Sequence, residues 1–259
     1  MQRGTGIKSW AISLRKYLLS NFPSLISSYY RFLWKPKEGK LEHLIDEFSK
    51  NRNEVFFIQV GSNDGFQHDP LCKFIKRDGW KGILLEPQTK AFQTLREIYR
   101  NDKVVAVNKA LDREDGQRKL FKLNFSDERW ASGLCSFDRS HLENMITNGH
   151  VARKSKDERI VGSGNFDEYI GYDYVDCISF PTLFQNHAVS KVDLLHIDTE
   201  GHDCVILQHF DFNTYRPNIV IFESSHLSPD EYHRCEQYLG GFGYRLSNYG
   251  ADTVALITV

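Results

Sequence analysis

A short segment near residue 200 gathers side chains that could do chemistry. It reads HIDTEGH and holds two carboxylates, Asp198 and Glu200, followed by His202. A carboxylate can orient a substrate or accept a proton, and a histidine can accept a proton near neutral pH. We therefore expect Asp198 to orient the reacting groups and Glu200 or His202 to act as the base. The alternative for His202 is a structural position at the start of a helix.

These residues follow an apolar run at 192–197, which predicts a buried strand. The carboxyl ends of parallel strands form the edge at which open α/β sheets bind ligands. Burying two carboxylates at such a strand end costs free energy. Their presence therefore favours a functional role for Asp198 and Glu200. His196 shares a strand face with Asp198, and we expect it to pack structurally.

A further carboxylate, Glu223, follows the next apolar run at 218–222. It would face the same edge as Asp198, and hard oxygen ligands are typical of divalent-cation sites. Two ligands do not make a metal site. A metal held by Asp198 and Glu223 is therefore an alternative that the sequence leaves open.

A glycine-bounded loop, GSNDG at residues 61–65, directly follows a strand predicted at 55–60. Its glycines allow a sharp turn and a close approach to a ligand, while Asn63 and Asp64 can cap the turn or hold a charged group. Glu86 ends the next predicted strand, 25 residues after Gly61. This spacing is near that of a nucleoside-binding βαβ unit, and the carboxylate can accept hydrogen bonds from both ribose hydroxyls.

Residues 108–112 follow a third strand predicted at 104–107 and occupy a place that commonly flanks an adenine ring. The predicted cofactor-binding residues are Gln59, Gly61, Ser62, Asn63, Asp64, Gly65, Glu86, Pro87, Asn108, Ala110 and Asp198.

Strands and helices alternate from residue 54 onward, which predicts an α/β fold with a mostly parallel, Rossmann-like sheet covered by helices on both faces. Asp69 and Pro70 predict a helix start and Gly79 its end, and Ser228 is the expected cap of another helix. Two closing strands, at 244–247 and 253–259, are expected to bring an antiparallel last strand. We expect a helical arm over 1–52 and one domain over 53–259, with a substrate-side insertion at about 112–180 that carries a long irregular stretch.

The charge distribution bears on the partners. The chain has 259 residues and a net charge of −1, which argues against a general nucleic-acid binder. Residues 1–40 carry eight basic side chains and one acidic one, for a charge of +7, so the remainder carries −8. We expect the basic arm to pack on the domain. Dimerisation of two copies, or peripheral contact with an anionic membrane surface, are the alternatives.

The five cysteines form no CxxC pair and are odd in number. This argues against a disulfide framework or zinc knuckle and favours a reducing compartment. The N-terminus shows no secretory signal, and residues 17–34 are too polar to predict a transmembrane helix. A cytoplasmic location is therefore expected.

Taken in order, these motifs resemble the FkbM family of methyltransferases. The matching stretches, which span roughly residues 54–259, are FFIQVGSNDG, DPL, GWKGILLEP, VNKALD, VDLLHIDTEGHDCVIL, RPNIVIFESSHLS and DTVAL. The resemblance implies a class I enzyme that uses S-adenosyl-L-methionine to methylate a hydroxyl of a sugar, glycolipid or natural product. It also implies that loop 61–65 and Glu86 contact the cofactor and that residues 198–201 border the reacting centre. Residues 1–52 lie outside the resemblance, and 125–172 match poorly.

Three rival functions are weaker. A nicotinamide-dependent oxidoreductase would be expected to carry GxGxxG, which is missing here, and does not need the closing strand pair. A non-catalytic Rossmann-type binding module would not need to retain loop 61–65, Glu86 and Asp198 together. RNA methylation is disfavoured by the charge of −8 outside the arm.

Overall fold

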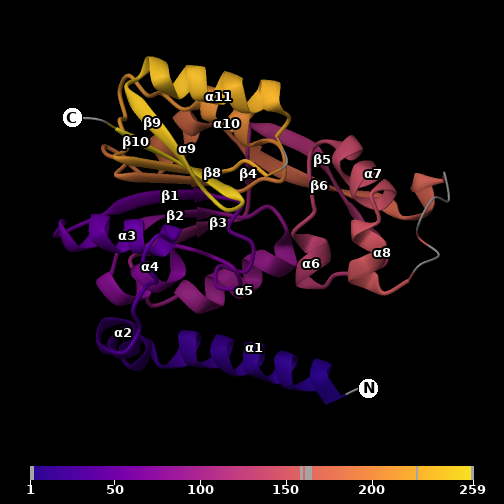
Figure 1. The fold of residues 1–259 in the computed structure, drawn as a ribbon, viewed down its shortest axis with the longest axis horizontal. Helices are drawn as coiled ribbons and strands as arrows, with labels where there is room; N and C mark the ends of the chain where they lie inside the picture. The colour runs from indigo at the N-terminus through magenta and orange to yellow at the C-terminus, as the bar shows by residue number, and fades with distance from the viewer. Residues whose placement is uncertain (1–2, 158–159, 161–164, 226, 258–259) are drawn as a thin grey trace.

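The computed structural model describes residues 3–157, 160, 165–225 and 227–257. Its centre is a seven-stranded sheet with the order β3-β2-β1-β7-β8-β10-β9 (Figure 1). The strands are β1 (Phe56–Val60), β2 (Lys81–Leu85), β3 (Val104–Val107), β7 (Leu194–Ile197), β8 (Ile219–Glu223), β9 (Tyr244–Tyr249) and β10 (Asp252–Ile257). The first five run parallel to their neighbours, whereas β10 pairs antiparallel with both β8 and β9. The predicted Rossmann-like α/β fold with an antiparallel last strand is confirmed.

Helices cover both faces of this sheet because its central strands are apolar on both sides. Along β1, Phe57 belongs to the core on one face and Ile58 to the core on the other, and both are fully buried. The helices on the Phe57 face are α3 (Leu41–Lys50), α4 (Cys72–Asp78) and α5 (Thr89–Tyr99). Those on the Ile58 face are α9 (Phe180–Asn186), α10 (Asp203–His209) and α11 (Pro229–Gly241).

Residues 110–178 build a second, three-stranded sheet in the order β4-β6-β5. Its elements are β4 (Ala110–Leu111), β5 (Gly116–Leu123), β6 (Ile170–Ile178), α6 (Arg129–Ser132), α7 (Arg139–Thr147), α8 (His150–Ser155) and a 3-10 turn (Phe166–Glu168). Leu123, Leu142, Ile146 and Val151 form a small separate core. The prediction of a long irregular stretch is therefore wrong for α6 to α8. The few apolar residues of this stretch suffice to pack short helices on β5 and β6.

The local start and stop signals were only partly right. The Asp69 carboxylate accepts the backbone N–H groups of Leu71 (2.6 Å) and Cys72 (3.0 Å), but the helix itself begins at Cys72 rather than at Pro70. Gly79 ends that helix with φ +67°, and Ser228 forms a capping box with Glu231 at the start of α11, both as predicted.

Cys204 of α10 and Cys235 of α11 form a disulfide, which the cysteine spacing did not indicate. It is a single bridge rather than a framework. The odd total of five is compatible with one pair, and Cys72, Cys135 and Cys177 are free thiols. The count alone could not predict which cysteines the packing of α10 on α11 brings together.

Two N-terminal helices, α1 (Arg3–Asn21) and α2 (Pro23–Phe32), lie outside α4 and α5 (Figure 1). Several of their basic side chains point inward. Lys16 pairs with Glu97 at 2.8 Å, and Arg31 donates to the backbone carbonyl of Arg77 at 2.9 Å. Within the described residues, no helix is long and apolar enough to cross a membrane.

Lys76 ties three helices together at the base of this layer. Its buried ammonium donates to the Asp102 carboxylate (2.5 Å), to the carbonyl of Ile98 at the end of α5 (2.7 Å) and to the carbonyl of Leu19 in α1 (3.4 Å). Removing one partner of such a buried ion pair destabilises the folded state, because the remaining charge is left buried and uncompensated.

We therefore expect Lys76→Met to lower the free energy of unfolding by about 3 kcal/mol, because Asp102 is left poorly solvated without its cation. Urea denaturation followed by circular dichroism measures this loss. Lys73→Met on the same helix is the control, since the pair of Lys73 with Glu42 is more exposed and its loss should cost no more than about 1 kcal/mol. Equal losses in the two variants would contradict the assignment.

Candidate active site

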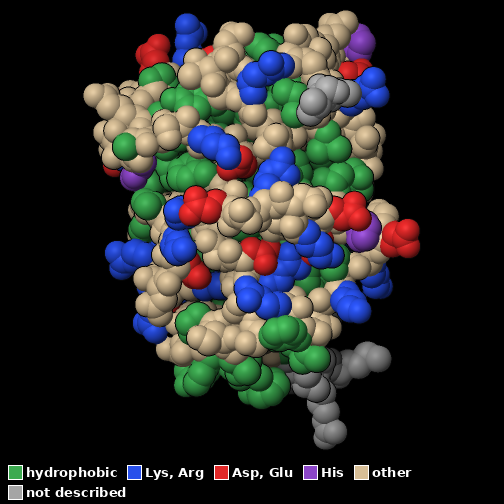
Figure 2. Space-filling view, turned by 90° about the vertical axis from the view of Figure 1, so that its left-hand side faces the viewer, with side chains coloured by type: hydrophobic (Ala, Val, Ile, Leu, Met, Phe, Trp, Pro, Cys, Tyr) green, Lys and Arg blue, Asp and Glu red, His purple; other side chains and the backbone are tan. Residues whose placement is uncertain are grey.

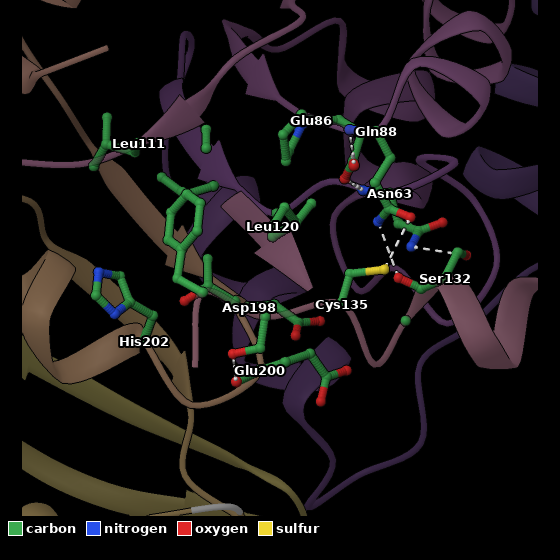
Figure 3. Close-up of a pocket in the computed structure, with 18 of the residues that line it drawn as sticks. Asn63, Glu86, Gln88, Leu111, Leu120, Ser132, Cys135, Asp198, Glu200 and His202 are labelled. Atoms are coloured by element: carbon green, nitrogen blue, oxygen red, sulfur yellow. Dashed lines mark hydrogen bonds between the residues drawn. The ribbon is translucent and has the colours of Figure 1, made fainter. Parts of the chain in front are cut away.

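A cavity of about 640 Å³, open to solvent, lies at the carboxyl ends of β1, β2 and β7. Glu86 borders one side of it and Asp198 and Glu200 border the other, while His202 lies at a further edge (Figure 3). Carboxylates from two separate strand ends thus face one hollow, as the sequence predicted for a ligand at this edge of the sheet.

The loop after β1 passes very close to the loop after β7. Gly61 has φ +80°, and a Cβ atom on it would lie 1.8 Å from the carbonyl oxygen of Asp198. Only glycine can therefore occupy this position without displacing the backbone. Asn63 also has a positive φ, of 46°, which this residue type tolerates better than most.

Glu86 holds that loop in place. One carboxylate oxygen accepts the backbone N–H of Asn63 at 2.7 Å, and the other accepts the backbone N–H of Gln88 at 2.8 Å. Burial raises the pKa of Glu86 from 4.5 to about 7, although these hydrogen bonds and the nearby Arg129 charge act in the opposite direction. Each oxygen keeps a lone pair for a ligand in the cavity.

Three carboxylates converge at the other side. Oxygens of Asp198, Glu200 and Glu223 lie within 4.8 Å of one another. Burial raises the pKa of Asp198 well above 3.8, and the negative charges of Glu223 and Glu200 raise it further. The sequence predicted that Asp198 and Glu223 would meet, and Glu200 joins them. This spacing fits a shared proton as well as a cation, so the metal stays a hypothesis.

A fourth acid, Asp203, fixes this cluster from behind. One of its oxygens accepts the N–H of Glu223 at 3.2 Å, and the other accepts the hydroxyl of Thr199 at 3.0 Å. Burial, with the charge of Glu223, raises the pKa of Asp203 to about 7. The side chain is fully buried and joins the ends of β7 and β8. Sequence reasoning missed this role, because Asp203 looked like an ordinary first residue of a helix.

The histidines divide as follows. His202 lines the cavity, and its ring packs edge-on against Phe137 at 5.6 Å. Burial and the Arg118 charge lower the pKa of His202, so it is neutral at pH 7 and able to accept a proton. His196 is buried in the sheet, where burial lowers its pKa to about 4. The imidazole of His141, from α7, lies 3.6 Å from the Glu200 carboxylate, a contact the sequence did not predict.

The second sheet and its helices cover the cavity. Leu120 of β5, Arg129 and Ser132 of α6, and Cys135 and Phe137 of the following loop line it. Asn63 points toward the Ser132 hydroxyl across this boundary, with a separation of 3.5 Å. None of these residues was predicted for the site, because their spacing carries no recognisable pattern and the segment lies where the family resemblance is poor.

Residues 59–246, more than half of the chain, match the family model described as the methyltransferase FkbM domain. The chain belongs to the FkbM methyltransferase family. It is therefore a methyltransferase, and its family and fold are those of enzymes that transfer a methyl group from S-adenosylmethionine. A comparison with curated protein sequences found no match.

Solved structures with a similar fold are distant in sequence. Methyltransferase FkbM from Methylobacillus flagellatus KT is 10% identical with a TM-score of 0.49, covering 89% of this chain and 50% of that one. An O-methyltransferase from Bacillus cereus in complex with SAH is 10% identical with a TM-score of 0.43, covering 95% and 97%. A fibrillarin/Nop5p complex is 10% identical with a TM-score of 0.40, covering 80% and 74%. This chain thus spans half the length of the FkbM structure.

The predicted site residues fall into two groups in this FkbM protein. Those that line the cavity are Gly61, Asn63, Glu86, Pro87, Ala110, Asp198, Glu200 and His202. Those that do not line it are Gln59, Ser62, Asp64, Gly65 and Asn108.

The second group supports the loops from behind. Gln59 donates to Asp69, the Ser62 hydroxyl donates to the carbonyl of Gln59, and Asp64 accepts the N–H groups of Phe66 and Gln67. The carbonyl of Gly65 accepts the Tyr99 hydroxyl, and Asn108 donates to the carbonyls of Glu86 and Pro87. The loop sequence predicted where these residues lie but not which of them turn away from the cavity.

The close approach at Gly61 gives a stability prediction. Gly61→Ala should lower the free energy of unfolding by more than about 3 kcal/mol, because the new methyl group would overlap the carbonyl of Asp198. Gly79→Ala is the matched control: its φ of +67° is also positive, but nothing lies within 4 Å of the added atom, so about 1–2 kcal/mol is expected. Thermal unfolding compares the two, and a Gly61 variant as stable as the control would refute the contact.

Proposed function

We propose that this FkbM protein transfers a methyl group from S-adenosyl-L-methionine to a hydroxyl oxygen of a sugar, glycolipid or related small molecule. The observation that carries the proposal is the single cavity with the Glu86 carboxylate on one side and the Asp198, Glu200 and His202 side chains on the other. The first side suits a nucleoside and the second suits a reacting centre.

The residues present fit the cofactor. Glu86 is positioned to accept the ribose hydroxyls, and the Gly61 backbone allows the ligand to approach closely. Ala110 and Leu111 offer an apolar wall for the adenine ring. The cation of Arg129 borders the cavity near loop 61–65, where it would pair with the carboxylate of the amino-acid part.

The bound cofactor supplies a methyl group that is already activated by its sulfonium charge, so the chain's main task is alignment. Good orientation alone can lower a barrier by on the order of 7–11 kcal/mol. The acceptor hydroxyl must also lose its proton. An ordinary carboxylate is a weak base for this, so the proton is expected to leave late, as the methyl group transfers. Asp198 orients the hydroxyl, and Glu200 or the neutral His202 takes the proton.

A neighbouring cavity of about 950 Å³, open to solvent, adjoins the first beside Pro87 and Gln88 and offers room for the remote part of a hydroxyl-rich acceptor. It shares four lining residues with the first cavity, namely Pro87, Gln88, Leu120 and Cys135, and polar side chains dominate its lining. The residues that supply these groups include Gln117, Lys122, Asp173, Tyr174 and Asp176. Amide and carboxylate groups beside an aromatic ring form the kind of surface that hydrogen-bonds and stacks on a sugar.

Isothermal titration calorimetry with S-adenosylhomocysteine and, separately, with NAD tests the cofactor. We expect a saturable isotherm with the first ligand and no heat of binding with the second. Transfer of a labelled methyl group from S-adenosylmethionine to a glycan or glycolipid extract then tests the acceptor class. Binding of NAD alone would indicate an oxidoreductase, and binding of S-adenosylhomocysteine with no transfer to any extract would indicate a binding module.

Asp198→Ala should reduce turnover by roughly 10²–10⁴-fold with little change in the affinity for S-adenosylhomocysteine, because the variant loses the group that orients the acceptor. Steady-state assay with the labelled donor measures this. Glu114→Ala, which removes an exposed carboxylate elsewhere on the domain, is the control. Unchanged turnover in a folded Asp198 variant would discard the role.

The pKa of Glu86 predicts a pH effect on cofactor binding. Since burial raises that pKa to about 7, the carboxylate is mostly protonated at about pH 6 and mostly ionised at about pH 8, where it is the better acceptor for ribose hydroxyls. Affinity for S-adenosylhomocysteine should therefore rise roughly tenfold over this range. Glu86→Gln should bind more weakly and show a flat profile, and a flat profile in the unaltered protein would count against the contact.

A further inference from the structure

The outer face of α1 and α2 is unusually apolar for a protein surface. Nine of the fourteen exposed large hydrophobic side chains among the described residues lie between positions 10 and 33. The most exposed are Leu33 (75%), Phe32 (74%), Trp10 (66%) and Leu25 (59%). Figure 2 shows hydrophobic side chains gathered along the lower end of the molecule, which is the α1 and α2 end in Figure 1. Scattered apolar residues are normal on a surface, but a gathered patch marks an interaction site.

These side chains form one continuous stripe. Trp10, Leu14 and Tyr17 follow helical spacing on α1, so they share a face. On α2 and its ends, Phe22, Leu25, Tyr29, Phe32 and Leu33 are likewise exposed, whereas Ile26 and Tyr30 are buried. The rings of Tyr17 and Phe22 touch edge-to-face at 5.7 Å and connect the two halves. The two helices therefore present a single apolar surface, here called the N-terminal face.

The charges around the N-terminal face are mostly positive. Residues 1–37 contain no Asp or Glu. Lys35 and Lys37 are exposed directly after α2, and the exposed Glu38 and Lys40 follow them. Lys16 and Arg31 instead contact the domain. Lys16 pairs with Glu97 of α5, and Arg31 donates a hydrogen bond to the carbonyl of Arg77 in α4. Lys16 and Arg31 thus hold the two helices on the domain, and Lys35 and Lys37 flank the apolar stripe.

We propose that the N-terminal face docks on an anionic lipid surface, with α1 and α2 lying in the plane of the interface. Exposed Trp, Tyr and Phe are the side chains that favour the boundary between headgroups and acyl chains, and lysines beside them favour anionic headgroups. No described helix can cross a membrane, which fits a helix pair that lies on the surface. The orientation places the apolar stripe in the interface and leaves the domain in water.

A second copy of the chain is a weaker occupant of this face. A two-fold dimer brings the same surface of each copy together. The lysines after α2 would then lie near those of the partner copy, and Glu38 is the one acidic side chain within residues 1–40 to compensate for them. An anionic lipid surface supplies the missing charge, which is why we favour it over self-association.

Co-sedimentation of the full chain with vesicles tests the proposal. We expect binding to mixed phosphatidylcholine and phosphatidylglycerol vesicles, and much weaker binding to phosphatidylcholine alone. Phe32→Ser with Leu33→Ser should lower the partition constant by at least about tenfold, because both apolar groups leave the interface. Lys35→Gln with Lys37→Gln should weaken binding to the anionic vesicles only, by about fivefold for each lysine.

Matched controls lie elsewhere on the surface. Val105→Ser with Phe125→Ser removes two exposed apolar side chains outside the N-terminal face, and Lys103→Gln removes an exposed lysine on the domain. These variants should bind vesicles as the unaltered protein does, and circular dichroism checks that each variant is folded. Failure of the unaltered protein to bind either vesicle, or equal binding by the Phe32 and Leu33 variant, would overturn the proposal. A dimer in sedimentation velocity that this variant dissociates, without vesicle binding, would assign the face to a second copy instead.

Discussion

The site depends on one buried carboxylate that holds two loops at the same time. Glu86 accepts the N–H groups of Asn63 and Gln88, so the loop after β1 and the loop after β2 are fixed to each other through its two oxygens. Gly61 in the first loop also touches the backbone of Asp198. The position of the loop after β7 is therefore fixed relative to the other two loops. Three strand ends therefore have little freedom to move independently, and a preorganised cavity follows from backbone contacts before any ligand is present.

Features that depend on local pattern could be predicted from the sequence. The apolar runs gave the strands of the large sheet, since a strand buried on both faces cannot be polar. Gly61, Glu86 and Asp198 were predicted at the site because each directly follows such a run, and parallel strands end at a common edge. The last two apolar runs likewise predicted the closing strand pair, whose antiparallel last strand is β10.

What was missed depends on contacts between segments far apart in the chain. Arg129 reaches the cavity, and His141 reaches Glu200, only because the second sheet folds over the first, and no spacing within their own segment indicates this. Asp203 serves as a bridge between β7 and β8 through hydrogen bonds to Glu223 and Thr199, which a sequence does not display. Conversely, Asp64 and Gly65 occupy the predicted loop but turn inward, because side-chain direction in an irregular loop follows no period.

The segment that covers the cavity leaves and rejoins the large domain at one place. Its two ends are hydrogen-bonded side by side: β4 pairs in parallel with the last residues of β6, and the N–H of Asp112 donates to the carbonyl of Ile178 at 3.1 Å. A piece of chain attached in this way can be replaced by another of different length without disturbing the strands that flank it. Under the proposed function, exchange of this one segment would change the cavity wall that β5 and α6 supply, and with it the acceptor, while Gly61, Glu86 and Asp198 stay in place. Chimaeras joined at this seam offer a direct route to altered acceptor range.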